Sequence, residues 1–281
     1  MCYAEFMIKP YATVAAGYTV YSDVEFMNFP AGEAHFKIGS AANEQTPSHI
    51  IITGTDANDF MRAGLWIDYA HQHGHEVSVV IPYLPAARAD RGEPFGAKVY
   101  ANMINALEAD RVICFDPHSP VITTLVNNLT VIDPAEPLAK WLGHFGQHYD
   151  GIIAPDAGAV NRATKAAKAF GLPVYKAGKK RDFETGKLTG FHCEELPVGG
   201  RYLVVDDICD GGGTFRGLAA ATGLPKENLD LWVSHGVFSG AAGELKNHFG
   251  QIFTTDSHPG HTNPEVNARI LPIASIIPTY L

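Results

Sequence analysis

Short apolar segments alternate with helix-like segments along most of the chain, and this alternation constrains the fold more than any other feature. The apolar segments are rich in β-branched residues, which is typical of strands buried on both faces. Strands that alternate with helices form mostly parallel sheets, because the helix carries the chain back before the next strand begins. The predicted strands cover 49–53, 76–84, 111–115, 151–154, 173–176, 202–205, 229–234 and 252–254, and the predicted helices cover 57–73, 97–109, 135–145, 159–170, 215–222 and 241–249.

The alternation starts a second time after Asp133. We therefore predict an α/β fold with two similar domains, residues 1–140 and 141–281, each a mostly parallel sheet flanked by helices. Ligands of such sheets bind outside the carboxyl ends of the strands. The segments that directly follow strands are thus the candidate binding segments.

Composition excludes several classes of partner. The chain has 281 residues, of which 46% are hydrophobic and 18% charged, as expected for a globular core. A net charge of −9 disfavours nucleic-acid binding, and no apolar run approaches the roughly 20 residues of a membrane span. Four widely spaced cysteines without a CxxC pair, and an N-terminus without a visible signal peptide, favour a cytoplasmic location.

The segment RYLVVDDICDGGGTF, residues 201–215, carries the most specific binding signal. We expect Asp206 and Asp207 to end a buried strand, and Gly211–Gly213 to form a turn that allows positive φ and close approach of a ligand. The next helix begins near Thr214, and amides at a helix N-terminus bind anions. Acids beside an anion site suit sugar hydroxyls or a metal ion. The segment predicts a site for a phosphorylated sugar, and the alternative is an acidic turn between strand and helix.

Two further segments follow strands of the first half. IPYLPAARADRGEPFG, residues 81–96, places Arg88 and Arg91 on one loop, which suits nucleotide phosphates. A solvated loop with an Arg–Asp pair is the alternative. ICFDPHSP, residues 113–120, places His118 at a strand end, where it could bind metal or phosphate or be merely hydrogen-bonded.

Other candidate segments are less specific. In IIAPDAGAVNRA, residues 152–163, Asp156 could bind magnesium beside turn amides that hold pyrophosphate, or could cap a helix. AGKKRDFETGK, residues 177–187, is expected to be a mobile basic loop or a solvated turn. NFPAGEAHFKI, residues 28–38, predicts a hairpin whose turn contains Phe29, Gly32 and Glu33.

In their order along the chain, the motifs resemble those of the ribose-phosphate pyrophosphokinases, the family that makes phosphoribosyl pyrophosphate (PRPP). VVDDICDGGGT resembles the family's ribose-5-phosphate loop, which type I phosphoribosyltransferases share. PYLPAARADR is similar to its ATP-binding arginine loop, DPHS to its histidine loop, APDAGAVNRA to its pyrophosphate loop, and KKR falls at its catalytic flexible loop. FPAGE resembles a hairpin that reaches the adenine of a neighbouring subunit's ATP, and SHGVFSG is similar to a stretch of the second domain. The resemblance implies two type I phosphoribosyltransferase-like domains.

The resemblance also implies an activity: Mg-ATP gives its β,γ-diphosphoryl group to the C1 hydroxyl of a 5-phosphorylated ribose, leaving AMP. It implies magnesium as cofactor and a homodimer or hexamer with shared ATP sites. By position, ATP would be bound by Phe29, Glu33, Arg88, Arg91 and His118; magnesium by His118 and Asp156; and the sugar phosphate by Asp206, Asp207, Asp210, Gly211, Gly212, Gly213 and Thr214. The catalytic residues would be Lys179, Arg181 and His118.

Three positions depart from the family pattern and leave the acceptor open. Gly211 stands where threonine is usual, which removes a phosphate contact and opens space. The acceptor could therefore be ADP-ribose, used in NAD salvage, instead of ribose 5-phosphate. Ala31 and Ala89 replace an acid and a glutamine near the nucleotide. A type I phosphoribosyltransferase, which needs no ATP, and a non-catalytic regulatory homologue are further alternatives.

Overall fold

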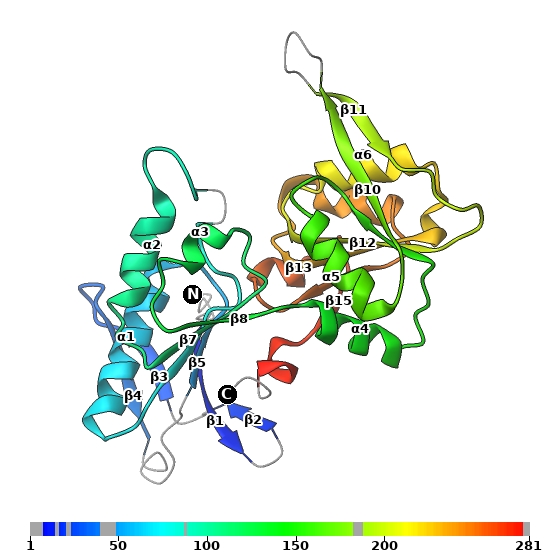
Figure 1. Ribbon diagram of the computed structural model, residues 1–281. Helices are drawn as coiled ribbons and strands as arrows, with labels where there is room; N and C mark the ends of the chain where they lie inside the picture. Colours follow the sequence, from blue (N-terminus) through cyan, green and yellow to red (C-terminus); the bar gives the residue numbers. More distant parts are fainter. Residues whose placement is uncertain are drawn as a thin grey trace. The chain divides into compact units, whose positions relative to one another are not determined.

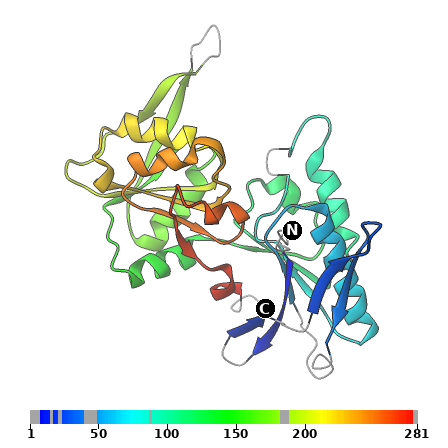
Figure 2. The same ribbon diagram turned by 180° about the vertical axis from the view of Figure 1, so that it is seen from behind.

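The chain folds into two compact units, drawn in Figure 1 and from behind in Figure 2. The structure, a computed structural model, describes residues 8–14, 17–20, 24–39, 49–86, 89–181 and 188–277. Unit 1 comprises residues 1–132 and 273–281, and unit 2 comprises residues 133–272. The sequence-based division at residue 140 assigned residues 133–140 to the first domain and residues 273–281 to the second, whereas residues 133–140 group with unit 2 and the described residues 273–277 group with unit 1. The predicted α/β fold, with sheets flanked by helices, is confirmed.

Unit 1 is built on one sheet and one separate hairpin. Its strands are β1 (Ile8–Val14), β2 (Gly17–Val20), β3 (Val24–Asn28), β4 (Ala34–Ile38), β5 (His49–Ile52), β6 (Ser78–Val80), β7 (Arg111–Phe115) and β8 (Leu129–Ile132), and its helices are α1 (Ala57–Gln72), α2 (Gly96–Asn105), α3 (Pro120–Thr123) and η5 (Ile273–Ser275). The sheet order is β2-β1-β5-β6-β7-β8, and β5 to β8 run parallel. Strands β1, β2 and β8 were not predicted, and β6 is shorter than the predicted strand 76–84.

Helices α1 and α2 cover one face of this sheet. Alternate strand residues such as Ile50, Val79 and Cys114 point to that face and pack with Trp66 of α1 and Ile104 of α2. The predicted hairpin at residues 28–38 is confirmed as β3–β4, a sheet of its own that packs on α1. These contacts hold the hairpin turn in a fixed place relative to the sheet of unit 1.

Unit 2 is likewise a mostly parallel sheet flanked by helices. Its strands are β9 (Gly151–Ala154), β10 (Val174–Arg181), β11 (Leu188–Cys193), β12 (Tyr202–Cys209), β13 (Leu229–Gly236), β14 (Ile252–Thr255) and β15 (Arg269–Leu271), and its helices are α4 (Ala135–His144), α5 (Val160–Phe170), α6 (Gly213–Thr222), η2 (Lys226–Asn228), η3 (Gly240–Asn247) and η4 (Pro259–Thr262). The order is β11-β10-β9-β12-β13-β14-β15, and all neighbours pair in parallel except β10 with β11.

Both faces of the second sheet are covered. Val204 and Leu231 pack with Phe215 of α6 and Leu245 of η3 on one face. On the other face α5 packs on β9 and β12. Burial on both faces explains why the strands of this sheet read as continuous apolar runs. No helix within the described residues combines the length and the apolar character that crossing a bilayer requires.

Three sequence-based boundaries and one helix type around the predicted site are wrong. Strand β12 continues past the predicted end at Val205 to Cys209, because its pairing with β13 continues through Asp206. Helix α6 begins at Gly213, two residues before the predicted start. Strand β10 continues to Arg181, and the predicted helix 241–249 is instead the 3-10 helix η3.

A buried carboxylate links three segments of unit 2. The side chain of Asp230, on β13, has 0% relative exposure. Its Oδ2 accepts hydrogen bonds from Tyr149 Oη at 2.8 Å and Arg201 Nη2 at 2.7 Å, and its Oδ1 accepts one from the Gln251 amide at 2.9 Å. Burial raises the pKa of Asp230, and its hydrogen-bond partners and the Arg201 charge oppose that effect. The Asp230 carboxylate thus provides the Tyr149 hydroxyl, the Arg201 guanidinium and the Gln251 amide with a hydrogen-bond acceptor in place of water.

We expect Asp230→Ala to lower the free energy of unfolding by about 3 kcal/mol, because it leaves a guanidinium and a hydroxyl without their partner. Urea unfolding followed by tryptophan fluorescence measures the loss. Lys165→Met is the control, since Lys165 pairs with Asp133 at the surface and such a pair contributes under about 1 kcal/mol. Equal losses in the two variants would contradict the role given to Asp230.

Candidate active site

The candidate acceptor site of unit 2 lies where β9, β12 and β13 end. Parallel strands bring their carboxyl ends to the same edge of a sheet, so the segments that follow them are neighbours. Two backbone hydrogen bonds join two of these segments, since the amides of Val237 and Phe238 both donate to the Cys209 carbonyl at 3.0 Å. Segments about 30 residues apart in the sequence therefore form one wall.

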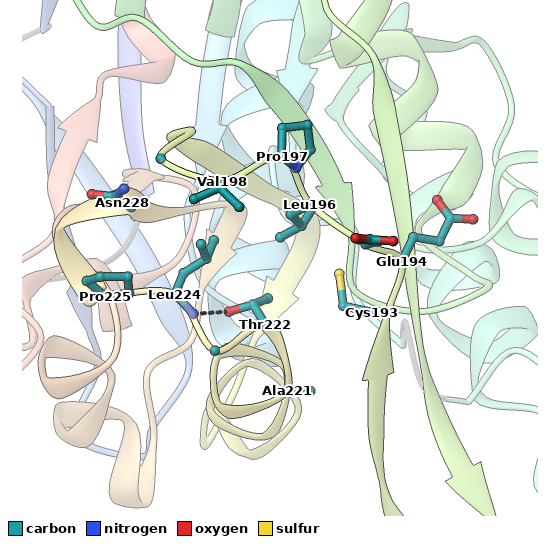
Figure 3. A pocket seen from close by; sticks show the side chains of 13 residues that line it. Cys193, Glu194, Leu196, Pro197, Val198, Ala221, Thr222, Leu224, Pro225 and Asn228 are labelled. Atoms are coloured by element: carbon teal, nitrogen blue, oxygen red, sulfur yellow. Dashed lines mark hydrogen bonds between the residues drawn. The ribbon is translucent and has the colours of Figure 1, made fainter.

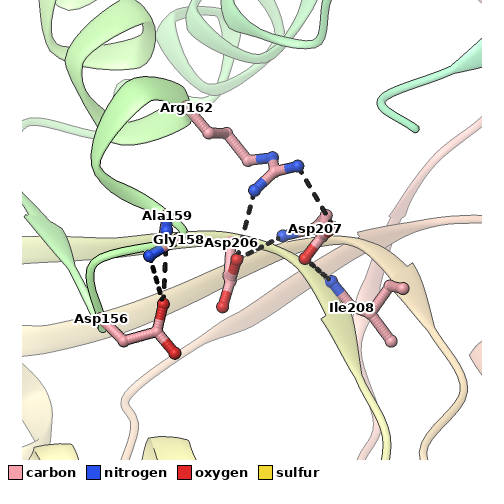
Figure 4. A network of polar contacts seen from close by, with 7 residues as sticks. All are labelled: Asp156, Gly158, Ala159, Arg162, Asp206, Asp207 and Ile208. Atoms are coloured by element: carbon pink, nitrogen blue, oxygen red, sulfur yellow. Dashed lines mark hydrogen bonds and ion pairs between the residues drawn. The ribbon is translucent and has the colours of Figure 1, made fainter. Parts of the chain in front are cut away.

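Asp206 and Asp207 lie inside β12 and share one cation, Arg162 of α5 (Figure 4). Arg162 Nη1 lies 3.4 Å from Asp206 Oδ1, and its Nη2 lies 3.2 Å from Asp207 Oδ2. The side chains of Arg162, Asp206 and Asp207 are 14%, 15% and 4% exposed. The structure thus brings the predicted acid pair together in a place with little water.

Each acid also bonds the chain directly after it. Asp206 Oδ1 accepts a hydrogen bond from the Asp207 amide at 2.9 Å, and Asp207 Oδ1 accepts one from the Ile208 amide at 2.8 Å. Burial raises the pKa of Asp206 well above its ordinary value, and the neighbouring charge of Asp207 raises it further. Arg162 acts in the opposite direction, because its positive charge favours the ionised carboxylate.

The glycine turn after the acids has one conformationally demanding position. Gly212 has φ +74°, and a Cβ there would lie 3.0 Å from the Leu245 side chain. Gly211 and Gly213 lack positive φ, so within the turn the positive φ that the sequence allowed for occurs at Gly212. A Cβ on Gly213 would meet nothing within 4 Å, and one on Gly211 only the Ser239 carbonyl at 3.9 Å. These two glycines leave open space beside the first amides of α6.

Asp210, between the strand and the glycines, is held in place by Ser239, whose hydroxyl donates to Asp210 Oδ1. Arg216 Nη1 donates to the Gly211 carbonyl at 3.1 Å and to the Ala241 carbonyl at 2.8 Å. Both contacts tie the turn to the segment that follows β13. Thr214 is the second residue of α6, as the sequence suggested for its first turn.

Asp156, after β9, closes the turn that leads into α5. Its Oδ1 accepts hydrogen bonds from the Gly158 amide at 3.0 Å and the Ala159 amide at 3.3 Å. This is the helix-capping alternative considered from the sequence. Both hydrogen bonds end on one oxygen of the carboxylate, and Figure 4 draws Asp156 together with Asp206.

The predicted basic loop at residues 177–187 is wrong in part. Lys179 and Arg181 lie on β10, paired in register with Phe191 and Leu188 of β11, while residues 182–187 lie outside the described residues. Strand pairing overrides the polar composition of this stretch, because an antiparallel partner satisfies its backbone groups. Figure 1 shows the β10–β11 hairpin extending beyond the rest of unit 2.

The candidate nucleotide loops of unit 1 follow β6 and β7. Asp90 accepts hydrogen bonds from the Ser119 hydroxyl and from Arg91, which together hold the pKa of Asp90 below its ordinary value; the nearby His118 adds to this effect. The contact with Ser119 joins the arginine loop to the histidine loop. Arg91 is 89% exposed and His118 is exposed, whereas Arg88 lies outside the described residues.

Two local features shape these loops. A Cβ on Gly96 would lie 2.7 Å from Ala89 Cβ, so glycine allows the arginine loop to close on the start of α2. Asp116, directly after β7, has φ +42° and is buried, and its amide donates to the Ile132 carbonyl at 3.0 Å. Such a conformation is uncommon outside glycine and is frequent at binding sites.

The β3–β4 hairpin presents Phe29 and Glu33 at its turn, where the Phe29 amide donates to the Glu33 carbonyl at 2.8 Å. Phe29 is 46% exposed and stacks on the His35 ring, with ring centroids 5.0 Å apart. Arg62 of α1 donates to Asn28 Oδ1 at 2.9 Å and so anchors the base of the turn. The hairpin therefore projects an aromatic ring from a well-supported position.

The carboxylates of unit 2 fit magnesium chemically, since Mg²⁺ prefers oxygen ligands and commonly takes one or two carboxylates together with substrate phosphates. Asp156, Asp206 and Asp207 supply such oxygens at neighbouring strand ends. His118 offers nitrogen, which suits a phosphate better. Within the described ranges, no three His, Cys, Asp or Glu side chains converge into a metal cage.

A separate cavity of about 570 Å³ lies at the other end of α6 (Figure 3). Its lining includes Cys193, Leu196, Val198, Thr222 and Leu224, and none of its lining residues is a candidate site residue. Because the glycine turn precedes α6 and this cavity adjoins the helix C-terminus, the cavity is distinct from the acceptor site.

Comparisons with known proteins agree with this geometry. Residues 13–107 match the family model described as the N-terminal domain of ribose phosphate pyrophosphokinase. Over 221 residues the chain is 31% identical to the ribose-phosphate pyrophosphokinase of Hyphomonas neptunium, an alignment that covers 72% of this chain and 68% of that relative. The chain belongs to the ribose-phosphate pyrophosphokinase family. The family resemblance read from the motifs is thereby confirmed, as is the prediction of a diphosphotransferase enzyme.

Two further comparisons extend this result to the fold. The ribose-phosphate pyrophosphokinase of Cereibacter sphaeroides is 31% identical over 249 residues, which cover 81% of this chain and 70% of the relative. The crystal structure of phosphoribosylpyrophosphate synthetase from Mycobacterium smegmatis superposes with a TM-score of 0.72 at 21% identity, covering 92% of this chain and 88% of that chain. This likeness confirms the type I phosphoribosyltransferase-like fold predicted for the pyrophosphokinase family.

Sequence reasoning missed several residues that organise the site, chiefly Arg162, Ser239 and Arg216. Arg162 lies in a motif that was recognised for Asp156, and it is a cation next to the alanine-rich face that α5 buries. The available signal was the combination of an arginine in this motif with two adjacent acids in the segment 201–215, because such acids need a counter-charge when they are buried. Ser239 lies in the recognised motif SHGVFSG, but neither this motif nor the sequence around Arg216 indicated the contacts of the two side chains, because these depend on how the segment after β13 folds back.

The contrast between the glycines yields a stability prediction. Gly212→Ala should cost about 1–2 kcal/mol in free energy of unfolding, because alanine is strained in the left-handed region. Gly213→Ala should change stability by less than about 0.5 kcal/mol, since its Cβ meets no neighbour. Urea unfolding of both variants without ligands makes the comparison. A larger loss for Gly213→Ala would refute the assignment of the demanding position to Gly212.

Proposed function

We propose that the chain transfers the β,γ-diphosphoryl group of Mg-ATP to the C1 hydroxyl of ribose 5-phosphate, giving AMP and PRPP. Membership of the pyrophosphokinase family supports the reaction class and a place in nucleotide biosynthesis. One observation supports a phosphorylated ribose as acceptor: the carboxylate pair near the end of β12 is followed by an open turn at the N-terminus of α6. A phosphorylated ribose presents hydroxyls and an anion, and this strand end offers a partner for each.

In the proposed acceptor complex, Asp206 and Asp207 accept hydrogen bonds from the ribose hydroxyls. Asp210 to Thr214 surround the 5-phosphate, with the first amides of α6 as donors. The open space beside Gly211 and Gly213 supports this placement, because it lets an anion reach the backbone. We assign acceptor binding to unit 2 on these grounds.

We assign ATP binding to unit 1. Arg88, Arg91 and His118 would bind its phosphates, and the side chains of Arg91 and His118 are exposed. Asp156 would hold magnesium, which neutralises phosphate charge when it is bound, and His118 would contact phosphate instead of the metal. Lys179 and Arg181 would stabilise the charge that develops on the transferring group, in an in-line displacement without a covalent intermediate.

We further propose a homodimer or hexamer in which Phe29 and Glu33 contact the adenine of a partner's ATP. The exposure of Phe29 at a supported hairpin turn favours this role over one in the core. A cytoplasmic location is proposed from the cysteines, since the described Cys114, Cys193 and Cys209 are unpaired thiols.

ADP-ribose is the second candidate acceptor, and one observation favours it. Gly211 has ordinary backbone geometry and only one neighbour near a Cβ, so a side chain could stand there without strain. Its absence leaves space next to the proposed 5-phosphate position, and a second phosphate could occupy that space. The product would then be ADP-ribose 1-pyrophosphate.

The test of the function is a comparison of acceptors. Purified protein is incubated with ATP, magnesium and either ribose 5-phosphate or ADP-ribose, and AMP release is measured. We expect AMP with ribose 5-phosphate. Release with ADP-ribose alone would replace the acceptor, and consumption of PRPP without ATP would indicate a phosphoribosyltransferase. No turnover with any of these substrates would indicate a regulatory homologue.

A substitution at Gly211 tests the acceptor by a second route. Gly211→Thr should lower the KM for ribose 5-phosphate several-fold, because a hydroxyl adds a hydrogen bond to the phosphate. Gly211→Ala is the matched control, since it fills the same space without a hydroxyl. Equal KM values for the two variants and the parent would argue against a 5-phosphate beside this residue.

A further inference from the structure

We infer that Arg162 is a positioning residue for the acceptor: it holds the carboxylates of Asp206 and Asp207 in one orientation, so that both can receive the ribose hydroxyls. This inference rests on the proposed function for the identity of the ligand. The ion-pair geometry that carries it belongs to unit 2 alone. None of the sequence motifs assigned a role to this arginine.

The directions of the Asp206 and Asp207 side chains point to a role for Arg162. Neighbouring side chains of a regular strand point to opposite faces of the sheet, yet Asp206 and Asp207 both reach one guanidinium, as Figure 4 shows. Something must therefore draw the two carboxylates together. Arg162 contacts both of them, through different nitrogens.

The second step concerns charge. Two buried carboxylates side by side repel each other, and each loses hydration. A planar guanidinium presents separate N–H donors in a fixed fork, so it can bond two acceptors at once, whereas an ammonium is a single point of charge. With side-chain exposures of 14%, 15% and 4%, the three groups have little water to replace these contacts.

Contacts from Arg162 and from the backbone restrain the orientation of both carboxylates. The contacts given to Asp206 by Arg162 and by the Asp207 amide both end on Oδ1. Arg162 and the Ile208 amide take different oxygens of Asp207. Arg162 and the Asp207 amide thus restrain Oδ1 of Asp206, and this restraint also orients Oδ2 of the same carboxylate. Helix α5 in turn fixes the arginine, because its alanine face packs against the sheet.

The kinetic test uses Arg162→Met, which keeps length and removes charge, and Arg162→Lys, which keeps charge and removes the fork. Lys165→Met is the control, since it removes an exposed cation three residues further along the same helix. We expect Arg162→Met to raise the KM for ribose 5-phosphate at least about tenfold with the KM for ATP within about twofold, and Arg162→Lys to recover part of the loss. A lower kcat with both KM values unchanged would overturn the inference, because a purely structural role reduces only the fraction of folded enzyme.

A second measurement needs no substrate and separates failure of this inference from failure of the proposed function. Urea unfolding of Arg162→Met, Asp206→Asn and the double variant forms a double-mutant cycle. We expect the effects on the unfolding equilibrium constant to depart from independence by about tenfold. Independent effects would overturn the inference even if the enzyme makes PRPP. Coupled effects in a protein that releases no AMP would uphold the ion-pair geometry and refute the proposed function instead.

Discussion

The acceptor site depends on the compensation of two adjacent buried carboxylates. Asp206 and Asp207 stand at the end of a strand with most of their hydration removed, and such a pair is stable only with a counter-charge close by. Arg162 provides it from α5, so the helix that follows Asp156 and the strand that precedes the glycine turn are joined by the same contact. The turn that follows β9 and the turn that follows β12 are therefore parts of one structure within unit 2. Loss of the arginine would affect both, although it belongs to neither turn.

The same logic of strand ends operates in unit 1, with different chemistry. There the loops after β6 and β7 are joined by Asp90, which accepts from Ser119 and Arg91, and no buried acid pair is involved. The exposed side chains, Arg91 and His118, are both cations or potential cations. Unit 1 thus presents positive groups suited to phosphates, and unit 2 presents carboxylates and amides suited to a sugar phosphate. One architecture supplies both because these groups lie at or beyond the ends of strands, where side chains can vary without disturbing the rest of the sheet.

Much of this could be predicted from the sequence, and the failures have physical causes. The strands at 111–115 and 151–154 were placed correctly, because buried parallel strands are short apolar runs with sharp ends. The end of β12 was misplaced, since acids usually end strands, and here pairing with β13 continues through Asp206. Lys179 was assigned to a loop because local composition cannot reveal the antiparallel partner that β11 provides. The contacts of Arg162 and Ser239 were missed for the same reason, as they join segments far apart in the sequence.

The glycine turn shows how conformational need and ligand access can be separated. Only Gly212 combines positive φ with a crowded neighbour, so its glycine is explained by the fold. Gly211 and Gly213 could carry side chains without strain, so the fold does not explain them. Glycine also costs backbone entropy, and its use where no conformation requires it points to a molecule that must approach the backbone. The two sterically unnecessary glycines flank the position from which the α6 amides are reached, and this argues for an anion that is bulky at that point. In the proposed site, the size of this anion would distinguish ribose 5-phosphate from ADP-ribose, because both acceptors present ribose hydroxyls to the acid pair.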